Sequence, residues 1–256
     1  MRTETAQDAD VVLQKLPSDM GIHRNPRKGT LNAPDAVLEG MSFDARLMVD
    51  EVFPDEFNLE ETHRRIENNT RELFNYGKPL LSIGGDHSVS YPVLKVLKEQ
   101  NPGLELVWLD AHLDLKEPVD GHVSHDVVVR ELLEHGFSPE EIWFVGVTRV
   151  DEDEEGLLDK KQFHCYGPAE IDDFLEEFEP GSAYLSIDID ALSPEYAPGT
   201  GYPDGELSLE DMEGVIELVD PVHADLVEVA PPLDKGGRTL DSARSLLKAL
   251  SRALDR

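Results

Sequence analysis

Seven short apolar segments alternate with helix-like segments along this chain, and that alternation constrains the fold more than any other feature. The apolar segments are candidate strands at 10–16, 79–83, 104–109, 142–147, 163–166, 183–189 and 223–229. Their apolar residues are continuous rather than alternating with polar ones, which is typical of strands buried on both faces. Strands that alternate with helices form parallel sheets covered on both sides. The sequence therefore predicts an α/β fold with a mostly parallel sheet.

Three of the intervening helices are marked by apolar residues at three- and four-residue steps. One begins after Ser208, a predicted N-cap with Asp211 three residues later. The apolar residues of the three helices are Leu209, Met212, Ile216 and Val219, then Leu59, Ile66 and Leu73, and finally Leu240, Ala243, Leu247, Leu250 and Leu254. Because no repeat, low-complexity tract or Gly/Ser linker divides the chain, we expect one domain over residues 1–256.

The charge balance is strongly acidic, with 54 Asp and Glu against 23 Lys and Arg and a formal net charge of −31. Such a surface repels nucleic acids and anionic lipids. The acidic residues are spread along the whole chain, so we interpret them as adaptation to a salt-rich cytoplasm; an acidic patch for a cationic protein is the alternative. We expect no membrane span, because no run approaches the roughly 20 apolar residues that one needs. The N-terminus lacks the apolar core of a secretion signal, and the single cysteine, Cys165, suits a reducing compartment.

Acidic residues and histidines follow four of the predicted strands, where this architecture places ligand sites. "GGDHS" follows the strand at 79–83, "DAHLD" follows the strand at 104–109, "DID" ends the strand at 183–189, and a glutamate lies within the last strand. Taken singly, "GGDHS" could be a turn with an N-cap, and the "DID" pair could be one N-cap and one ion pair. Together they predict a metal site with the candidate ligands His87, Asp110, His112, Asp114, Asp188 and Asp190.

The types of residue in this set indicate which metal to expect. Asp188 and Asp190 are two apart and point to one face of their strand, so burying both without a cation would be costly. Carboxylates and imidazoles without a thiolate suit Mn²⁺ better than structural zinc or copper. Six side chains are too many for one tetrahedral zinc and suit two ions with bridging carboxylates. Two divalent ions, four carboxylates and a bridging hydroxide sum to −1, so the site should accept a cation rather than a phosphate ester.

The motifs carrying these residues resemble those of the ureohydrolase family, which includes arginases, agmatinases and formiminoglutamases. "SIGGDHS", "WLDAHLDL", "SIDIDALSPEYAPGTGYP" and "EVAPPLD" occur in the family order, and the resemblance spans nearly the whole chain. It implies a three-layer α/β/α domain with a mostly parallel eight-stranded sheet, assembled into trimers or hexamers. It also implies that the six ligands bind two Mn²⁺ per chain, with Asp110 and Asp188 as the bridging pair.

The resemblance further implies a mechanism, in which a hydroxide held by both metals attacks the central carbon of a guanidinium and releases urea and an amine. Glu228 matches the carboxylate that binds the guanidinium, and a two-point contact of this kind is strong and directional. His125, in "GHVSHDVVVREL", matches a histidine used for proton transfer, and nearby His122 is the competing candidate. Asp86 is expected to orient a ligand or cap a helix rather than bind metal.

The substrate is predicted from weaker signals. In "DLKEP", Lys116 stands where arginases have an asparagine that helps to hold arginine, and the "SHDVVVREL" segment is closer to microbial agmatinases. We therefore expect agmatine, hydrolysed to putrescine and urea. Lys116 could instead repel its ammonium group, or hold the carboxylate of 4-guanidinobutyrate or formiminoglutamate, so these substrates and arginine remain alternatives. Ser193 replaces a common family aspartate, and the loop after Pro203 is shorter than usual, which should reshape the pocket rim.

Two other classes of function compete with this interpretation. A catalytically silent paralogue would keep the fold for assembly, but all six candidate ligands are present. A deacetylase on a related fold would use one zinc and fewer acidic ligands, which the retention of His87 and Asp114 disfavours. Two manganese ions per chain, one zinc or no metal requirement would distinguish the three.

Overall fold

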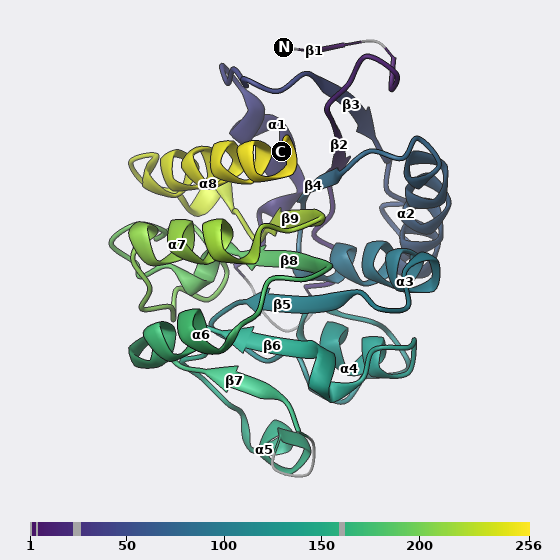
Figure 1. Cartoon of the computed structure of the whole chain (residues 1–256). Coiled ribbons are helices and arrows are strands. Elements are labelled where there is room, and N and C mark those ends of the chain that lie inside the picture. The colour runs from purple at the N-terminus through teal and green to yellow at the C-terminus, as the bar shows by residue number, and fades with distance from the viewer. Residues whose placement is uncertain (1, 4, 23–26, 159–161) are drawn as a thin grey trace.

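One parallel sheet forms the middle layer of the molecule (Figure 1). In the computed structural model, which describes residues 2–3, 5–22, 27–158 and 162–256, the sheet has nine strands in the order β1-β3-β2-β4-β9-β8-β5-β6-β7. All the pairings between these strands are parallel. The strands are β1 (Arg2–Thr3), β2 (Val11–Leu16), β3 (Leu47–Glu51), β4 (Leu80–Gly84), β5 (Glu105–Leu109), β6 (Ile142–Val145), β7 (His164–Tyr166), β8 (Ala183–Asp188) and β9 (His223–Val227).

The observed sheet confirms the predicted α/β class and extends the predicted set of strands. Each of the seven predicted segments contains a strand, although β6, β8 and β9 end one or two residues earlier than expected. The eight parallel strands that the resemblance implies are β2 to β9, and β1 adds a two-residue strand beside β3. The strand β3 was not predicted, because its sequence "LMVDE" ends in two acidic residues and only its first residue is fully buried.

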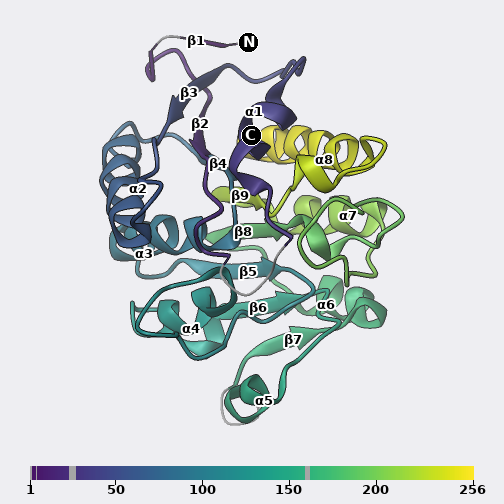
Figure 2. The ribbon, with the colours of Figure 1, turned by 180° about the vertical axis from the view of Figure 1, so that it is seen from behind.

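Helices cover the sheet on both faces, which gives three layers (Figures 1 and 2). On one side lie α2, α3 and α4, and on the other lie α1, α6, α7 and α8, whereas α5 lies beyond β7 at the edge. The helices are α1 (Ala33–Leu38), α2 (Leu59–Phe74), α3 (Ser90–Gln100), α4 (Val128–Leu133), α5 (Glu152–Leu158), α6 (Ile171–Glu177), α7 (Leu209–Val219) and α8 (Arg238–Leu254). The side chain of Ser208 caps α7 as predicted, by accepting a hydrogen bond from the backbone N–H of Asp211. Among the described helices, none has both the length and the apolar composition that crossing a bilayer requires.

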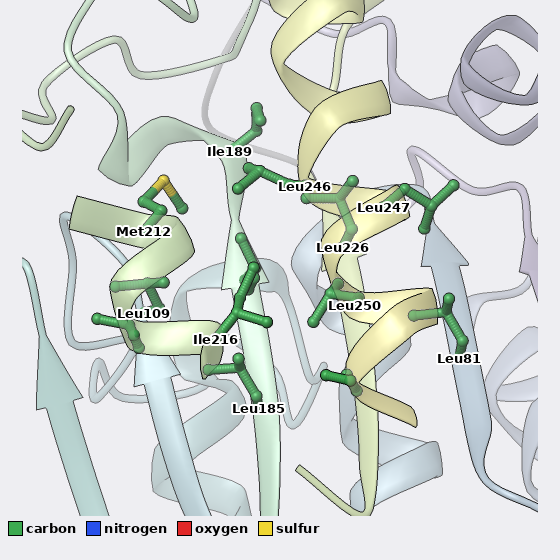
Figure 3. Packing of buried hydrophobic residues seen from close by; sticks show 14 of the residues in the cluster. Leu81, Leu109, Leu185, Ile189, Met212, Ile216, Leu226, Leu246, Leu247 and Leu250 are labelled. Carbon is green, nitrogen blue, oxygen red and sulfur yellow. The ribbon is translucent and has the colours of Figure 1, made fainter. Parts of the chain in front are cut away.

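Alternate residues of the central strands point into two separate hydrophobic layers. In β5, Val107 and Leu109 join the layer under α7 and α8, whereas Leu106 and Trp108 join the layer under α3 and α4. Figure 3 shows the first layer, in which side chains from the sheet meet those of two helices: Leu81, Leu109, Leu185 and Leu226 from strands, Ile189 from the turn after β8, Met212 and Ile216 from α7, and Leu246, Leu247 and Leu250 from α8. The strand ends are therefore held by a dry core on both faces.

The strand order also determines where polar residues can meet. The strands β4, β9, β8 and β5 are consecutive in the sheet, although their sequence positions run from 80 to 227. Their carboxyl ends lie on the same edge because every pairing is parallel. The four segments that carry the predicted ligands and Glu228 follow these four strands.

Candidate metal centre and substrate pocket

The loop after β4 is shaped by a close approach of two backbones. A Cβ atom on Gly85 would lie 2.6 Å from the backbone oxygen of Ser18 and 2.7 Å from that of Leu16, so only glycine fits there. The chain then turns through Asp86, whose Oδ1 accepts a hydrogen bond from Ser88 N and whose Oδ2 accepts one from Gly21 N. Asp86 thus caps the 3₁₀ turn at His87–Val89, as expected. This turn directs the His87 ring toward the ends of β5 and β8.

The six predicted ligands come together as two groups that share one aspartate. In the first group, His87 Nδ1 lies 3.1 Å from Asp110 Oδ2, 3.4 Å from Asp114 Oδ2 and 3.2 Å from Asp188 Oδ2. In the second, His112 Nδ1 lies 3.3 Å from Asp110 Oδ1 and 3.2 Å from Asp190 Oδ2. The two oxygens of Asp110 therefore face two different histidines. Ligand atoms of His87, Asp110 and Asp114, and likewise of Asp110, His112 and Asp190, all lie within 4.8 Å of one another.

Two of these atoms are buried without the hydrogen bonds that buried polar atoms usually have. Although they lie 3.1 Å apart, His87 Nδ1 and Asp110 Oδ2 make no well-aligned hydrogen bond. Because native structures leave few buried polar atoms unsatisfied, this cluster fits a site whose partners are cations. Imidazole nitrogens and carboxylate oxygens are a donor set that suits Mn²⁺.

Burial and mutual repulsion shift the acidity of the clustered carboxyl groups. Burial, together with the nearby charge of Asp110, raises the pKa of Asp114 well above its ordinary value. Burial raises the pKa of Asp188 in the same way, with the charges of Asp190 and Asp110 adding to it. The pKa of Asp190 rises to about 6, mainly through burial. These carboxyl groups are therefore reluctant to ionise together unless positive charge lies between them.

The outer nitrogen of His87 is held by a chain of buried groups. His87 Nε2 lies 2.9 Å from Ser186 Oγ, and Ser186 Oγ donates to Asp225 Oδ1 at 2.7 Å. The imidazole also stacks on the indole ring of Trp108, with centroids 3.9 Å apart and planes 5° apart. Since the single hydroxyl proton of Ser186 is given to Asp225, Nε2 must carry a proton, and Nδ1, which faces the carboxylates, is the nitrogen that would bind a metal ion. Such outer contacts fix the tautomer of metal-binding histidines.

A pocket opens beside this cluster, and the predicted catalytic residues line it. Its walls include His112, Asp114, Asp188, Asp190, His125, Glu228 and Tyr202. His125 Nδ1 lies 3.6 Å from Glu228 Oε1, which also accepts a hydrogen bond from His87 N at 2.8 Å. Burial opposes protonation of His125, but Glu228 and then Asp114 outweigh it and raise its pKa to about 9. His122 is exposed and does not line the pocket, so the structure favours His125 over its competitor.

The rim of the pocket carries Lys116 and residues that were not predicted from the sequence. Lys116 Nζ lies 2.7 Å from Asp151 Oδ2, and Arg149 Nε donates to Asp151 Oδ1 at 2.8 Å. Tyr202 lies between two histidines, with its ring centroid 5.6 Å from that of His112 and 6.1 Å from that of His125. Arg149 and Asp151 follow β6, so their position after a strand end was a signal that could have found them.

Ser193 and the short loop after Pro203, the two features that differ from the common family pattern, have structural roles. The backbone of Ser193 donates to Leu207 O and accepts from Tyr196 and Ala197, so this residue belongs to a tight turn outside the cluster. In the shortened loop after Pro203, Gly205 passes against the backbone that carries Asp190; a Cβ there would lie 2.0 Å from Asp190 O. The short loop therefore braces a predicted ligand directly.

Comparison with known proteins agrees with this geometry. A sequence model described as the arginase family matches residues 9–251. An agmatinase from Bacillus anthracis is 30% identical over 205 residues, which is 75% of this chain and 70% of that protein. A guanidinobutyrase from Pseudomonas aeruginosa is 30% identical over 200 residues, 72% of this chain and 63% of that protein. The crystal structure of formimidoylglutamase from Bacillus subtilis superposes with a TM-score of 0.88 at 18% identity, covering 100% of this chain and 90% of that one, and shows the same fold.

Proposed function

The chain belongs to the arginase family, and we propose that it is a ureohydrolase that holds two Mn²⁺ ions and hydrolyses agmatine to putrescine and urea. The observation that carries this proposal is the shared position of Asp110, whose two oxygens face His87 at 3.1 Å and His112 at 3.3 Å. That arrangement is what two neighbouring ions with a bridging carboxylate require.

The ligand sets follow from the same distances. His87, Asp110, Asp114 and Asp188 would hold one ion, and Asp110, His112 and Asp190 would hold the other. The second predicted bridge, Asp188, has one oxygen 3.2 Å from His87 Nδ1, while its other oxygen accepts a hydrogen bond from Asp190 N at 2.7 Å. Asp110 Oδ1 likewise accepts a hydrogen bond from His112 N at 2.7 Å, but the two oxygens of Asp110 also face the two histidines, so Asp110 is the better supported bridge.

Each pocket residue has a task in the proposed reaction. When bound, the two ions would lower the pKa of water so that it is nucleophilic near neutral pH. Glu228 would bind the guanidinium by a two-point, charge-assisted contact and orient its central carbon. His125, which lies 3.6 Å from Glu228, would move a proton to the departing amine. The ring of Tyr202, which lines the same pocket, would attract the guanidinium through its face.

Agmatine is favoured among the possible substrates by its charge and by the relatives. Agmatinases are among the proteins to which this chain is about 30% identical. The named guanidinobutyrase is similarly related, so 4-guanidinobutyrate is the principal alternative, followed by arginine and formiminoglutamate. A substrate with a positive charge at both ends also suits the strongly acidic chain.

The experiment that tests the proposal is hydrolysis by the Mn²⁺-loaded protein at molar salt, followed as urea release from the three guanidino compounds and as formamide release from formiminoglutamate. Agmatine, arginine, 4-guanidinobutyrate and formiminoglutamate are supplied separately, with putrescine measured in the agmatine reaction and the metal-depleted protein as control. Two manganese ions per chain and stoichiometric urea and putrescine are expected. One tightly held zinc with amide hydrolysis would point to a deacetylase, and no turnover of any substrate would point to a silent paralogue.

We also propose the setting in which this enzyme works. The net charge of −31 spread over the surface supports a salt-rich cytoplasm, with neither nucleic acid nor membrane as a partner. Assembly into a homo-oligomer, a trimer or a hexamer, is proposed from the family alone. Sedimentation velocity at low and molar salt tests both the assembly and its salt requirement.

A further inference from the structure

Two cationic side chains line the pocket that also contains His125 and Glu228. They are Lys116 and Arg149, and both reach the same cavity as the metal cluster. A pair of neighbouring cations is a receptor for a carboxylate. If both were available, the pocket would select guanidino acids such as 4-guanidinobutyrate over agmatine.

A carboxylate of the chain already occupies that receptor. Asp151 Oδ2 lies 2.7 Å from Lys116 Nζ, and Asp151 Oδ1 lies 2.8 Å from Arg149 Nε. Each oxygen thus takes one cation, as the carboxylate of a substrate would. The side chains of Lys116 and Asp151 are only 25% and 26% exposed, so this ion pair is better shielded than one on the open surface.

The surrounding charges leave the rim negative rather than positive. Lys116 shares the pocket wall with Asp126 and Glu154 as well as with Asp151. Arg149 has a second acidic neighbour, since its Nη1 lies 3.7 Å from Asp204 Oδ2. Even without the buried Glu154, the two cations face three carboxylates, those of Asp126, Asp151 and Asp204.

From these contacts we infer that Asp151 determines specificity by neutralising Lys116 and Arg149, so that the pocket accepts guanidino substrates with a cationic tail and rejects those with a carboxylate tail. The inference rests on the proposed function and deepens it. Its physical basis is that a substrate carboxylate would have to displace Asp151, whereas an ammonium group meets a rim with excess negative charge.

The test is the substitution Asp151→Asn, which keeps the size of the side chain and removes its charge. The backbone groups of Asp151 that begin α5 are unaffected, because Glu154 N bonds to its carbonyl oxygen and its N–H bonds to Glu154 Oε2. kcat/KM and Kd are measured for agmatine and for 4-guanidinobutyrate with the Mn²⁺-loaded proteins. The natural chain should prefer agmatine. For kcat/KM and for Kd alike, the preference for agmatine over 4-guanidinobutyrate should shift toward 4-guanidinobutyrate by about tenfold in the variant. The shift should appear in KM rather than kcat and should shrink as salt is raised.

A matched control is Glu117→Gln, which makes the same change of charge one residue from Lys116. The Glu117 side chain is 76% exposed and pairs with Arg130 rather than with either rim cation. In Glu117→Gln the preference for agmatine over 4-guanidinobutyrate should change by less than about twofold, because exposed ion pairs contribute little. Equal ratios for the natural chain, Asp151→Asn and Glu117→Gln would overturn the inference.

A second variant protects the test against misfolding of the first. Lys116→Gln in the natural background should lower kcat/KM for 4-guanidinobutyrate by less than about threefold, because a neutralised lysine contributes little to binding a carboxylate. Loss of that activity altogether would show that Lys116 already serves as the receptor, and the role of Asp151 would be refuted. Failure of the proposed function is a distinct result: neither substrate would release urea, while the two Kd values would still report on Asp151.

Discussion

The substitution Ser186→Ala removes the one hydroxyl that joins His87 to Asp225. Ser186 and Asp225 are register partners on the neighbouring strands β8 and β9, and both are fully or almost fully buried. Without Ser186 Oγ, the Nε2–H of His87 loses the partner that lies 2.9 Å away, and Asp225 Oδ1 loses the donor at 2.7 Å. Water has no ready access to either group from the dry layers that cover the sheet.

The magnitude of the effect follows from these two orphaned groups. A buried polar group without a partner costs about 1–3 kcal/mol, so the free energy of unfolding should fall by about 2–6 kcal/mol for the two groups. Freed of Ser186, the imidazole of His87 is no longer held with Nδ1 toward the carboxylates. Loss of such an outer contact lowers metal affinity by about 10- to 100-fold. The affinity for the proposed ion beside His87 should fall more than the affinity for the one beside His112.

The assay is calorimetric titration of the metal-depleted protein with Mn²⁺, and the control is Tyr184→Phe. Tyr184 donates to the other oxygen of Asp225 at 2.7 Å, and it is as buried as Ser186, but its hydroxyl bonds to Asp225 rather than to His87. Both variants therefore remove one hydrogen bond from Asp225, and only Ser186→Ala should weaken Mn²⁺ binding. If the two variants lost Mn²⁺ affinity equally, or if neither did, the positioning of His87 through Ser186 would be refuted.

Three further outcomes are expected. Gly205→Ala should destabilise the protein by about 1–3 kcal/mol, because the added Cβ would lie 2.0 Å from Asp190 O. Gly214→Ala in α7, where nothing lies within 4 Å of the added Cβ, should instead stabilise it by about 0.5–1 kcal/mol. Equal melting temperatures for the two variants would contradict this. His125→Asn should keep the two proposed Mn²⁺ ions yet lose about 10²-fold in kcat, and normal turnover would assign the proton transfer to another group. His223, whose Nδ1 accepts a hydrogen bond from Leu80 N, has its pKa lowered by burial from 6.5 to about 4. As the pH drops, this histidine is protonated in the unfolded chain before it is protonated in the folded one. The free energy of unfolding should therefore fall between pH 6.5 and pH 4, by at most about 3 kcal/mol. In His223→Gln the denaturant midpoint should decrease less steeply over this pH range, and an unchanged decrease would refute the linkage.

The sequence was a good guide to the strands that are buried on both faces. The segments of β4, β5 and β8 were predicted because their apolar residues face hydrophobic layers on both sides. The strand β3, which lies near one end of the sheet between β2 and the two-residue β1, was not predicted because its polar and acidic residues interrupt the apolar run. Strand order was not predictable from local pattern, because β9 pairs with β4 across more than a hundred residues.

For the site, the types of residue at the strand ends predicted which side chains come together. The sequence did not predict which residues from distant segments form hydrogen bonds or ion pairs with them. The positions of His87, Asp110 and Asp188 followed from the rule that parallel strands end on one edge. The partner of Lys116 did not follow, because Asp151 lies 35 residues further along, after another strand. Asp225 could have been suspected, since a carboxylate in the middle of an otherwise apolar strand needs buried partners.

The position of β9 has a consequence for how the molecule is made. Among the described strands, β4 and β8 are joined to each other only through β9, so the sheet consists of two halves until this strand inserts. A ribosome has already translated all six proposed ligands, the last of them Asp190, before residue 223 is added to the chain. Nascent chains should therefore bind the proposed manganese ions only after β9 has left the ribosomal tunnel. Truncation before β9 should yield a protein that cannot retain them, even though every proposed ligand has been synthesised.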